Sequence, residues 1–486
     1  MPDFIDSNET PTPDDPEDVS SDTHIEKVSL DEGYSHFSGP VYPVVGPMLP
    51  GTELPGVLPP PLLEPPVPTP SAGPVQGADR IDSMDVLRGV AVMGILVMNI
   101  QSFSMPDPAY HNPTTYGDLT GANYSVWYWS HVLAEFKFIT IFSMLFGAGL
   151  LVMRDRRIAS GRWAIGLHYR RMFFLLMFGL AHGYLVWFGD ILYAYAICGM
   201  VLYLFFWVPS WLLIILGLIS VAIARFTTDI VGAFETTYLS EEMYFRLLEQ
   251  GNPEPMRIRD EIEIYQGSYA TQMEHRPFEM LRIHRGFFPY IALRVGGTIL
   301  IGMGLYRMKF FSAKWPAWIY VSIMLLGGAV GLNMIMAGVE YNEAREWSYR
   351  DLYAWGWMYN YYGSVPLAVA WVALVMMICK ISFLHLFTRP FAAVGRMAFT
   401  NYLMHTAICT TIFYGHGFGL FAELDRVQQF EVVVGIWVFQ LIASPIWLSM
   451  FRFGPAEWLW RSLSYMKLQP MIVRDQTVAT QESASD

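Results

Sequence analysis

Residues 80–100 read RIDSMDVLRGVAVMGILVMNI, and no other stretch says as much about the fold. Its first turn is charged, with Asp85 and Arg88 three residues apart, and the run from Gly89 to Ile100 contains one strongly polar side chain, Asn99. A charge costs roughly 2.5–3.5 kcal/mol at the centre of a membrane helix, so polar groups there usually face a protein interior or a water-filled cavity. The stretch therefore predicts a first membrane-spanning helix with a polar site behind it.

The composition extends this interpretation to the whole chain. Of the 486 residues, 53% are hydrophobic and 15% are charged, and the mean hydropathy is +0.32. Soluble domains carry about 25% charged residues, so we expect an all-α, polytopic membrane helix bundle. The formal net charge of −12 comes from residues 1–79, which hold 14 acidic residues and one basic residue, Lys27. It therefore carries no information about substrates.

Residues 1–79 are predicted to form a disordered cytoplasmic tail. They contain 17 of the 31 prolines and few aromatic residues, so they cannot bury enough apolar surface to fold. The proline-rich stretch LPGVLPPPLLEPPVPTP is a spacer in the simplest interpretation and a binding motif in the alternative.

Ten segments approach the roughly 20 apolar residues that a membrane-spanning helix needs. They are 87–105, 131–153, 170–188, 190–208, 211–228, 286–306, 316–338, 357–378, 397–415 and 431–451. Because Lys and Arg accumulate on the cytoplasmic side, their distribution predicts a transmembrane domain over 80–470 with both termini inside. Loop 229–285 is then extracytoplasmic and 471–486 is a cytoplasmic tail. The loop either covers an outward-facing cavity or is a simple connector, and 383–396 either begins the ninth span or forms an interfacial helix.

Polar side chains from five of these segments are predicted to share one layer in the outer half of the membrane. At a rise of about 1.5 Å per residue, His182, Asp190, Lys137, Arg294 and Asn99 all fall toward the outer side. A histidine beside a carboxylate can act as a general base, and nearby cations can stabilise an oxyanion. The alternatives are an interhelical hydrogen bond for the histidine, a hairpin cap for the aspartate, and cations that extend toward the headgroups.

Two further pairs are candidates for substrate binding. Asp85 and Arg88 lie on one helical face, where they form either a structural ion pair or part of an anion site. His405 and Asn401, four residues apart on the ninth span, are core hydrogen-bonding groups in the first interpretation and site residues in the second. The three cysteines lie in apolar segments with no disulfide or zinc-binding pattern, and no metal site is predicted.

Other motifs narrow the function. The sequence has no phosphate-binding loop, dinucleotide fingerprint, zinc-protease motif or nucleophile elbow, and nothing favours nucleic-acid binding. The glycines of SMLFGAGLL (143–151) and RVGGTILIGMG (294–304) are typical of close helix packing. The aromatic clusters VWYW (126–129) and YAWGWMYNYY (353–362) are typical of a membrane interface, with a substrate entrance as the alternative.

Several motifs in order resemble the YeiB-like bacterial membrane proteins, which carry the domain of unknown function 418. The resemblance spans residues 80–470 and rests on RIDSMDVLRGVAVMGILVMNI, EFKFITIFSMLFGAGL, RRMFFLLMFGLAHGYLVWFGDILYAYAICG, RPFAAVGRMAFTNYLMH and GPAEWLWRSLSYMKLQPM. That family is grouped with the transmembrane acyltransferases, which include lysosomal heparan-glucosaminide acetyltransferase and the acyltransferase-3 proteins. Their first span is similar to the order found here: Arg80, Asp85, Arg88 followed by Gly89, and an apolar run that reaches Asn99.

The resemblance implies transfer of an acyl group from a cytoplasmic acyl-CoA to an extracytoplasmic glycan, lipid or small-molecule acceptor, in a bacterial inner membrane. It also implies a functional histidine in the outer part of the bundle, for which His111, His131 and His182 are available. The sequence departs from many family members in having His405 where they have glutamine.

On this hypothesis His182, oriented by Asp190, is the base. Lys137, Arg294 and Asn99 position the acceptor or the developing oxyanion, while Asp85 and Arg88 face the anionic part of the donor. No permanently bound cofactor is expected; acyl-CoA would be a co-substrate. The expected partners are the lipid bilayer, the acceptor and, as an open alternative, a second copy of the chain. The alternative functions are a transporter or exporter of a small anionic or amphipathic solute, and a non-catalytic membrane adaptor.

Overall fold

The computed structural model describes residues 82–238 and 253–473. Within these residues the chain is helical and has no strand; one isolated antiparallel bridge joins Phe451 to Ile472. The predicted all-α class is therefore confirmed. The bridge pairs Ile472, at the beginning of the predicted tail 471–486, with Phe451, which directly follows α17. The acidic tail 1–79, Arg80, residues 239–252 and the chain from 474 onward lie outside the described residues.

Five helical stretches are long and apolar enough to cross a membrane, judged by length and composition in the described residues. They are α1 (Asp82–Ser104), α3 (Gly121–Leu133) with α4 (Lys137–Ala159), α12 (Ala317–Glu343), α13 (Tyr349–Asp351) with η5 (Leu352–Gly356) and α14 (Trp357–Lys380), and α17 (Arg426–Met450). A sixth is added if the bent pair α10 (Tyr269–Gly286) and α11 (Leu293–Arg307), connected by η3 (Phe287–Ala292), is one broken span. These apolar helices indicate a membrane protein.

The other predicted spans are also helical, but their apolar parts are shorter or more polar. They are α5 (Ile165–Leu185), α6 (Leu192–Leu202) with η2 (Tyr203–Trp207), α7 (Ser210–Tyr238) and α16 (Ala398–Phe413). The expected hairpin over 170–208 is confirmed, because α5 and α6 pack together and are joined by residues 186–191. A helix therefore covers each of the ten predicted segments, whereas ten crossings are not confirmed.

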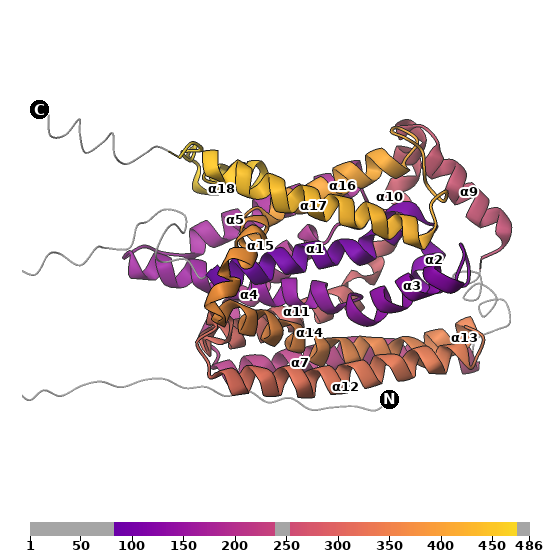
Figure 1. Ribbon diagram of the computed structural model, residues 1–486, viewed down its shortest axis with the longest axis horizontal. Helices are drawn as coiled ribbons and strands as arrows, with labels where there is room; N and C mark the ends of the chain where they lie inside the picture. Colours follow the sequence, from indigo (N-terminus) through magenta and orange to yellow (C-terminus); the bar gives the residue numbers. More distant parts are fainter. Residues whose placement is uncertain (1–81, 239–252, 474–486) are drawn as a thin grey trace, which may run out of the picture. The chain divides into compact units, whose positions relative to one another are not determined.

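Helix α1 lies inside the bundle, with α17 on one side and α14 and α12 on the other (Figure 1). It packs against α4, α14, α16, α17 and α15 (His385–Arg396). In the most apolar 18 residues of α1, 78% are buried, compared with 17% in α12 and 22% in α17. Those two outer helices expose large apolar side chains such as Leu325 and Ile442, which is the arrangement expected of helices that face lipid.

Glycines allow the closest helix contacts. A Cβ atom at Gly89 of α1 would collide with the backbone of α15, and one at Gly395 of α15 would collide with the backbone of α1. Helices α4 and α11 meet in the same way at Gly147 and Gly302. Because only glycine leaves room for such an approach, the predicted packing role of the two glycine-rich segments is confirmed.

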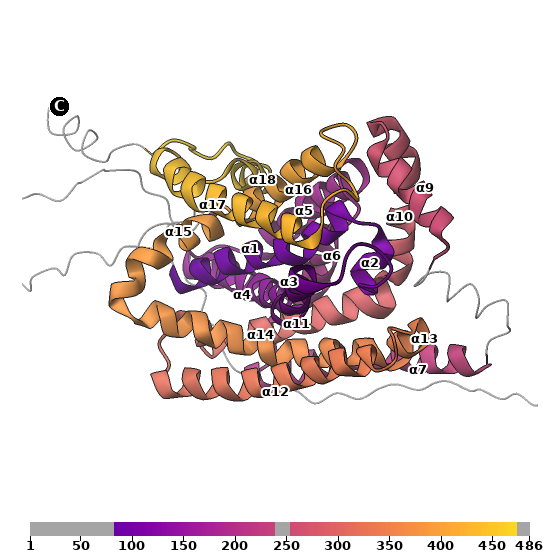
Figure 2. The same ribbon diagram turned by 45° about the vertical axis from the view of Figure 1, so that its right-hand side comes forward.

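The two ends of the bundle carry different short helices (Figure 1). The end that we call the α9 end carries α2 (Asp107–His111), α9 (Pro255–Gln266) and α13. The opposite end, which we call the α15 end, carries η4 (Phe310–Ser312), η6 (Ser382–Leu384), α15 and α18 (Pro455–Tyr465). At the α9 end, Tyr265 packs against Tyr414 and Phe421, and α10 packs against α5 (Figure 2). The helices of residues 253–285 are therefore packed against the bundle. Residues 385–396 form a separate helix before α16.

Candidate functional site

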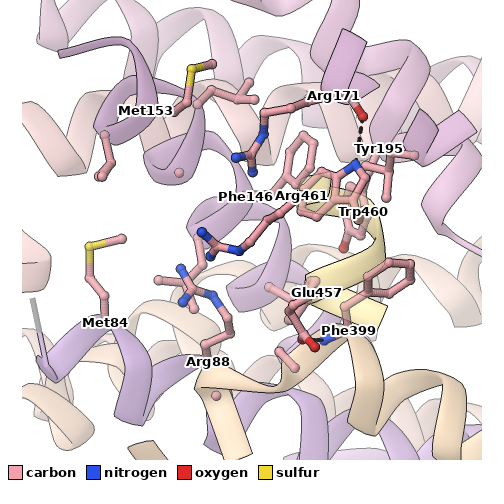
Figure 3. A pocket seen from close by; sticks show the side chains of 18 of the residues that line it. Met84, Arg88, Phe146, Met153, Arg171, Tyr195, Phe399, Glu457, Trp460 and Arg461 are labelled. Atoms are coloured by element: carbon pink, nitrogen blue, oxygen red, sulfur yellow. Dashed lines mark hydrogen bonds between the residues drawn. The ribbon is translucent and has the colours of Figure 1, made fainter. Parts of the chain in front are cut away.

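A cavity of about 280 Å³ lies at the α15 end between α1, α4, α5 and α18. Only two carboxylates, Asp85 and Glu457, line it, against six arginines. The arginines are Arg88, Arg156, Arg157, Arg171, Arg396 and Arg461. Figure 3 shows Arg88, Arg171 and Arg461 with their guanidinium groups turned toward the same space. We call this space the arginine cavity; its excess of guanidinium groups favours an anionic, phosphate-like ligand.

The predicted pair at the start of α1 forms part of this lining. Arg88 donates to Asp85 Oδ1 over 2.7 Å, and the two residues are one helical turn apart. The Asp85 side chain is 5% exposed, whereas that of Arg88 is 26% exposed and borders the cavity. Both open interpretations therefore apply: the pair is a structural ion pair that also lies on a candidate anion site.

The carboxylate of Glu457 on α18 is hydrogen-bonded to the backbone of another helix, α16. It accepts the N–H of Phe399 at 2.7 Å and that of Thr400 at 3.2 Å, in the first turn of α16. A helix N-terminus has unsatisfied N–H groups and a partial positive charge, which a carboxylate stabilises. The neighbouring Trp460 donates to the Arg171 carbonyl at 2.9 Å, so α18 ties α5 to α16.

Farther from the arginines, the cavity is apolar. Counted along α1, Ile95 lies seven residues beyond Arg88, about 10 Å deeper. Phe142, Phe146, Leu175, Ile191, Tyr195 and Tyr402 line this inner part. It suits the hydrocarbon portion of an amphipathic ligand whose anionic portion is bound by the arginines.

His182 and Asp190 lie behind this inner wall. His182 Nδ1 is 2.7 Å from Asp190 Oδ2, and His182 Nε2 is 3.0 Å from the hydroxyl of Thr406 on α16. All three residues are buried. The ring of Tyr402, which lines the cavity, lies 5.5 Å from the His182 ring between centroids, and Asp190 directly precedes the lining residue Ile191.

This arrangement has the geometry of an oriented general base. The second carboxylate oxygen of Asp190 accepts the N–H of Tyr193 at 3.1 Å, which fixes the carboxylate against α6. A neutral His182 that donates its Nδ1 proton to Asp190 presents its Nε2 lone pair toward Thr406. The structure thus brings the predicted pair together and adds a hydroxyl, on a distant part of the sequence, as a third member.

Lys137 belongs to a different group, which we call the Lys137 cluster and define as His131, Glu135, Lys137 and Asn360. Lys137 is fully buried and donates to the His131 carbonyl at 2.7 Å and to Asn360 Oδ1 at 2.6 Å. Asn360 donates to Glu135 Oε2 at 2.9 Å, and His131 Nδ1 pairs with the same carboxylate. Phe136, in a left-handed backbone conformation with φ of 63°, separates α3 from α4 at this point.

Arg294 of α11 lies next to this break. Its guanidinium group stacks over the rings of Phe136 and Tyr361, 4.4 and 4.1 Å from their centroids, and donates to Ser364 at 3.0 Å. Its Nη1 atom is buried and has no hydrogen-bond partner within the described part of the chain. Stacking and partial hydrogen bonding thus stabilise a second buried cation beside Lys137.

The single polar layer expected from the sequence is therefore two groups. No hydrogen bond or ion pair connects the His182 pair with the Lys137 cluster among residues 82–238 and 253–473. Asn99 is half-buried on α1 and is hydrogen-bonded to neither group in those residues. Depth in a helix follows from counting residues, but the direction in which a side chain points depends on the rotation of the helix, which counting does not give.

His405 has the first of its two expected roles. Its Nε2 atom lies 3.0 Å from Gln440 Oε1, and Gln440 donates to the Asn401 carbonyl at 3.1 Å. Asn401 in turn donates to Ser444. These bonds join α16 to α17 in the core, and none of the four residues lines the arginine cavity.

Besides Arg156 and Arg157, sequence reasoning missed four residues of the site. Asn360 lies within YAWGWMYNYY, where the aromatic residues suggested a membrane interface and drew attention away from the amide. Glu457 and Arg461 lie in GPAEWLWRSLSY, where charges within an aromatic segment were the available signal. No signal in the sequence pointed to Thr406, because threonines are common in membrane helices.

Comparison with known proteins agrees with the resemblance to the YeiB-like proteins. The sequence profile of the family described as "Protein of unknown function (DUF418)" matches residues 305–467. The uncharacterized protein YxaH of Bacillus subtilis (strain 168) is 30% identical over 435 residues, which are 82% of this chain and 98% of YxaH. The chain belongs to the YeiB-like DUF418 family. The uncharacterized protein YeiB of Escherichia coli (strain K12) is 28% identical over 425 residues, 81% of this chain and 98% of YeiB.

The matched segment of this DUF418 member runs from the end of α11 to α18. It contains Tyr402, Thr406 and Glu457, whereas His182 and Asp190 precede it. In the described ranges, no three His, Cys, Asp or Glu side chains gather in a way that would hold a metal ion.

Proposed function

We propose that this DUF418 protein is a membrane-embedded acyltransferase that moves an acyl group from acyl-CoA to a glycan, lipid or small-molecule acceptor on the opposite side of the membrane. One observation carries the proposal: the arginine cavity becomes apolar toward its inner part, and an Asp190–His182 pair lies directly behind that inner wall. The cavity matches the chemistry of a phosphorylated, thioester-bearing donor, and the pair matches the chemistry that the acceptor requires.

The donor would bind with its phosphates at the arginines. Guanidinium groups such as those of Arg88, Arg171 and Arg461 form charge-assisted, often bidentate hydrogen bonds with phosphate oxygens. The pantetheine arm and the acyl group would extend along Phe146 and Tyr195. Such an orientation would place the thioester in the apolar inner part of the cavity.

The reaction then requires one base. His182 Nε2 takes the proton from the acceptor hydroxyl or amine, whose oxygen or nitrogen attacks the thioester carbonyl. The carbon–sulfur bond breaks, and the leaving CoA thiolate takes the proton from His182 Nε2 to become the thiol, which returns His182 to its neutral form. Because Tyr402 lies between the cavity and His182, movement of this ring is part of the proposed cycle. Because the Lys137 cluster and Arg294 are not hydrogen-bonded to the His182 pair, they would bind a part of the acceptor that is remote from its reacting group.

The proposal includes a topology with ten crossings and both termini in the cytoplasm, in the bacterial inner membrane. Its support is the arginine content of the α15 end, which agrees with the enrichment of Lys and Arg on the cytoplasmic side. The apolar stretch Leu192–Trp207 and helix α16 are short for a full crossing, so this topology needs a locally thinner bilayer around them.

The test is turnover of radiolabelled acetyl-CoA by the purified protein in lipid nanodiscs, supplied with an extract of membrane glycans and lipids. His182→Ala and Asp190→Asn should lower the rate of acyl transfer by about 10²- to 10⁴-fold, because a general base contributes that much. His416→Ala, at an exposed histidine of the α9 end, is the matched control and should retain the rate. Retention of transfer by both site variants would show that the base is elsewhere.

The second candidate function is transport of a small anionic solute. One observation favours it: Lys137 and Arg294 are both buried beside a single carboxylate, Glu135, so this region carries an excess of positive charge inside the bundle. Substrate-dependent proton or sodium flux in proteoliposomes, without acyl transfer, would favour the transporter over the enzyme.

A further inference from the structure

A second cavity, of about 1060 Å³, lies at the α15 end between the start of α1, the η4 turn and α15. Its lining contains only two carboxylates, Asp82 and Asp155, and five residues with permanent positive charge. These are Arg307, Lys309, Lys314, Arg389 and Arg396. Arg396 is the only one of them that also lines the arginine cavity.

Three of the cations of this second cavity have no carboxylate partner among the described residues. Asp155 accepts from Arg154 at 3.2 Å and from the Tyr306 hydroxyl at 3.3 Å, so it is already engaged. Within the described part of the chain, no carboxylate forms an ion pair with Lys309, Lys314 or Arg389. The cavity therefore has an uncompensated positive charge at exposed side chains, which attracts an anion.

The turn that carries the two lysines is held in place. Lys309 and Ala313 flank η4 in left-handed conformations, with φ of 60° and 55°, which cost roughly 1–2 kcal/mol for a residue with a Cβ atom. Ser83 of α1 donates to the Phe311 carbonyl at 2.6 Å, and Lys380 of α14 donates to the Ala313 carbonyl at 3.0 Å. Contacts from two helices thus maintain a turn whose lysines line the cavity.

Helix α15 supplies the opposite wall with one of its faces. The lining residues follow each other at helical spacing along one stripe of α15: His385, Thr388, Arg389, Ala392, Ala393 and Arg396. The residues beside the stripe are large, apolar and exposed. Phe383 is 76% exposed, and Leu386 and Phe387 are each 67% exposed. A short helix with a cationic face and bulky apolar neighbours is typical of one that lies in a membrane interface.

We propose that this second cavity binds the phosphate-bearing headgroup of an anionic phospholipid. The headgroup phosphate would lie between Lys314 and Arg389, and the acyl chains would pack against Phe387 and its apolar neighbours. A soluble anion would use only the charges, whereas a lipid whose headgroup enters the cavity uses the charges and the exposed apolar side chains together. The inference does not depend on acyl transfer: the lipid site would remain if the protein were a transporter.

The experiment uses the full chain, purified in a neutral detergent and titrated with phosphatidylglycerol or phosphatidylcholine. Bound lipid is counted by native mass spectrometry. Phosphatidylglycerol should bind at least about tenfold more tightly than phosphatidylcholine, and Arg389→Gln combined with Lys314→Gln should remove that preference. Arg350→Gln, at an exposed arginine of the α9 end, is the matched control and should leave it unchanged. Equal binding of the two lipids by the wild-type protein would overturn the proposal.

Two further measurements separate the lipid from a free phosphate. Soluble glycerol phosphate should compete poorly with phosphatidylglycerol, and Phe387→Ser should weaken lipid binding while the cations are intact. If glycerol phosphate competes as well as the lipid, the cavity is a site for soluble anions and the lipid proposal is wrong. Size-exclusion profiles and thermal unfolding of each variant establish that a loss of binding is not a loss of folding.

Discussion

The hydroxyl of Thr406 lies 3.0 Å from His182 Nε2, although 224 residues separate the two in the sequence. With Asp190 on the other ring nitrogen, both nitrogens of His182 are engaged in the described structure. An acceptor that is to be deprotonated must therefore displace Thr406 from Nε2 or bind beside it. Thr406 is thus a positioning residue of the proposed base.

Thr406→Val should lower kcat for acyl transfer by about tenfold with little change in KM for acetyl-CoA, because the valine leaves His182 Nε2 without its hydrogen-bond partner. Thr406→Ser, which keeps a hydroxyl, should restore kcat, whereas a residue that only supports the fold would not show this split between kcat and KM. Thr411→Val, at an exposed threonine of the same helix, should change neither quantity.

Arg171→Gln should raise KM for acetyl-CoA by about tenfold or more with little change in kcat. A hydrogen bond to a charged group contributes about 1.5–3 kcal/mol, and binding of the donor phosphates precedes the chemical step. Arg162→Gln, in the preceding loop and outside the arginine cavity, should leave KM unchanged. A change in kcat alone would show that Arg171 does not bind the donor.

Lys137→Met should destabilise the protein strongly, by about 3–5 kcal/mol, because it leaves a buried carboxylate without its nearby cation. The double variant Glu135→Gln with Lys137→Met should be more stable than the sum of the two single effects, since it removes both charges of the pair together. Thermal unfolding in detergent measures this. Strict additivity would mean that the two residues do not interact.

Gly395→Ala should destabilise the protein by about 1–3 kcal/mol, since the added Cβ atom collides with the backbone of α1. The control is Gly435→Ala on α17, where a Cβ atom meets nothing within 4 Å. That variant should be neutral or slightly stabilising, because alanine favours the helix more than glycine does. Equal melting temperatures of the two variants would contradict the close crossing of α1 and α15.

The packing of α9 should depend on pH. Burial raises the pKa of Glu261 to about 7, and the nearby carboxylates of Asp107 and Glu279 add to this effect. The hydrogen bond that Glu261 accepts from the Asp107 N–H acts in the opposite direction. The folded protein then binds a proton between about pH 4.5 and 7 that the unfolded chain does not hold, so stability falls as the pH rises through this window. Glu261→Gln should flatten this part of the melting-temperature profile; an unchanged slope would assign it to other groups, such as His275.

The helix class and the positions of the ten helical segments could be predicted because a membrane helix satisfies its own backbone hydrogen bonds, which leaves length and apolar content as visible signals. The contact of His182 with Asp190 was predictable for a similar reason, since eight residues across a tight hairpin cannot be far apart. Crossings are harder to count, because a short apolar helix such as α16 has the composition of a span without its length.

The partners of these residues could not be predicted. Lys137 binds Asn360, 223 residues away, and Arg294 stacks on aromatic rings of α3–α4 and α14. Such contacts follow from how each helix is rotated against its neighbours, which the packing of glycines and large side chains decides. The break at Phe136 divided a predicted single span and gave Glu135 and Lys137 a common partner in Asn360.

The position of Arg396 links the two basic cavities. It follows Gly395, at the crossing of α15 with α1, and it borders both basic cavities. One guanidinium group cannot give its full charge to two anions at once, so a ligand that draws it into one cavity weakens the attraction of the other. By thermodynamic reciprocity, the proposed lipid and donor would then oppose each other's binding by the same factor. The lipid composition of the membrane would in this way set the concentration of donor at which the protein works.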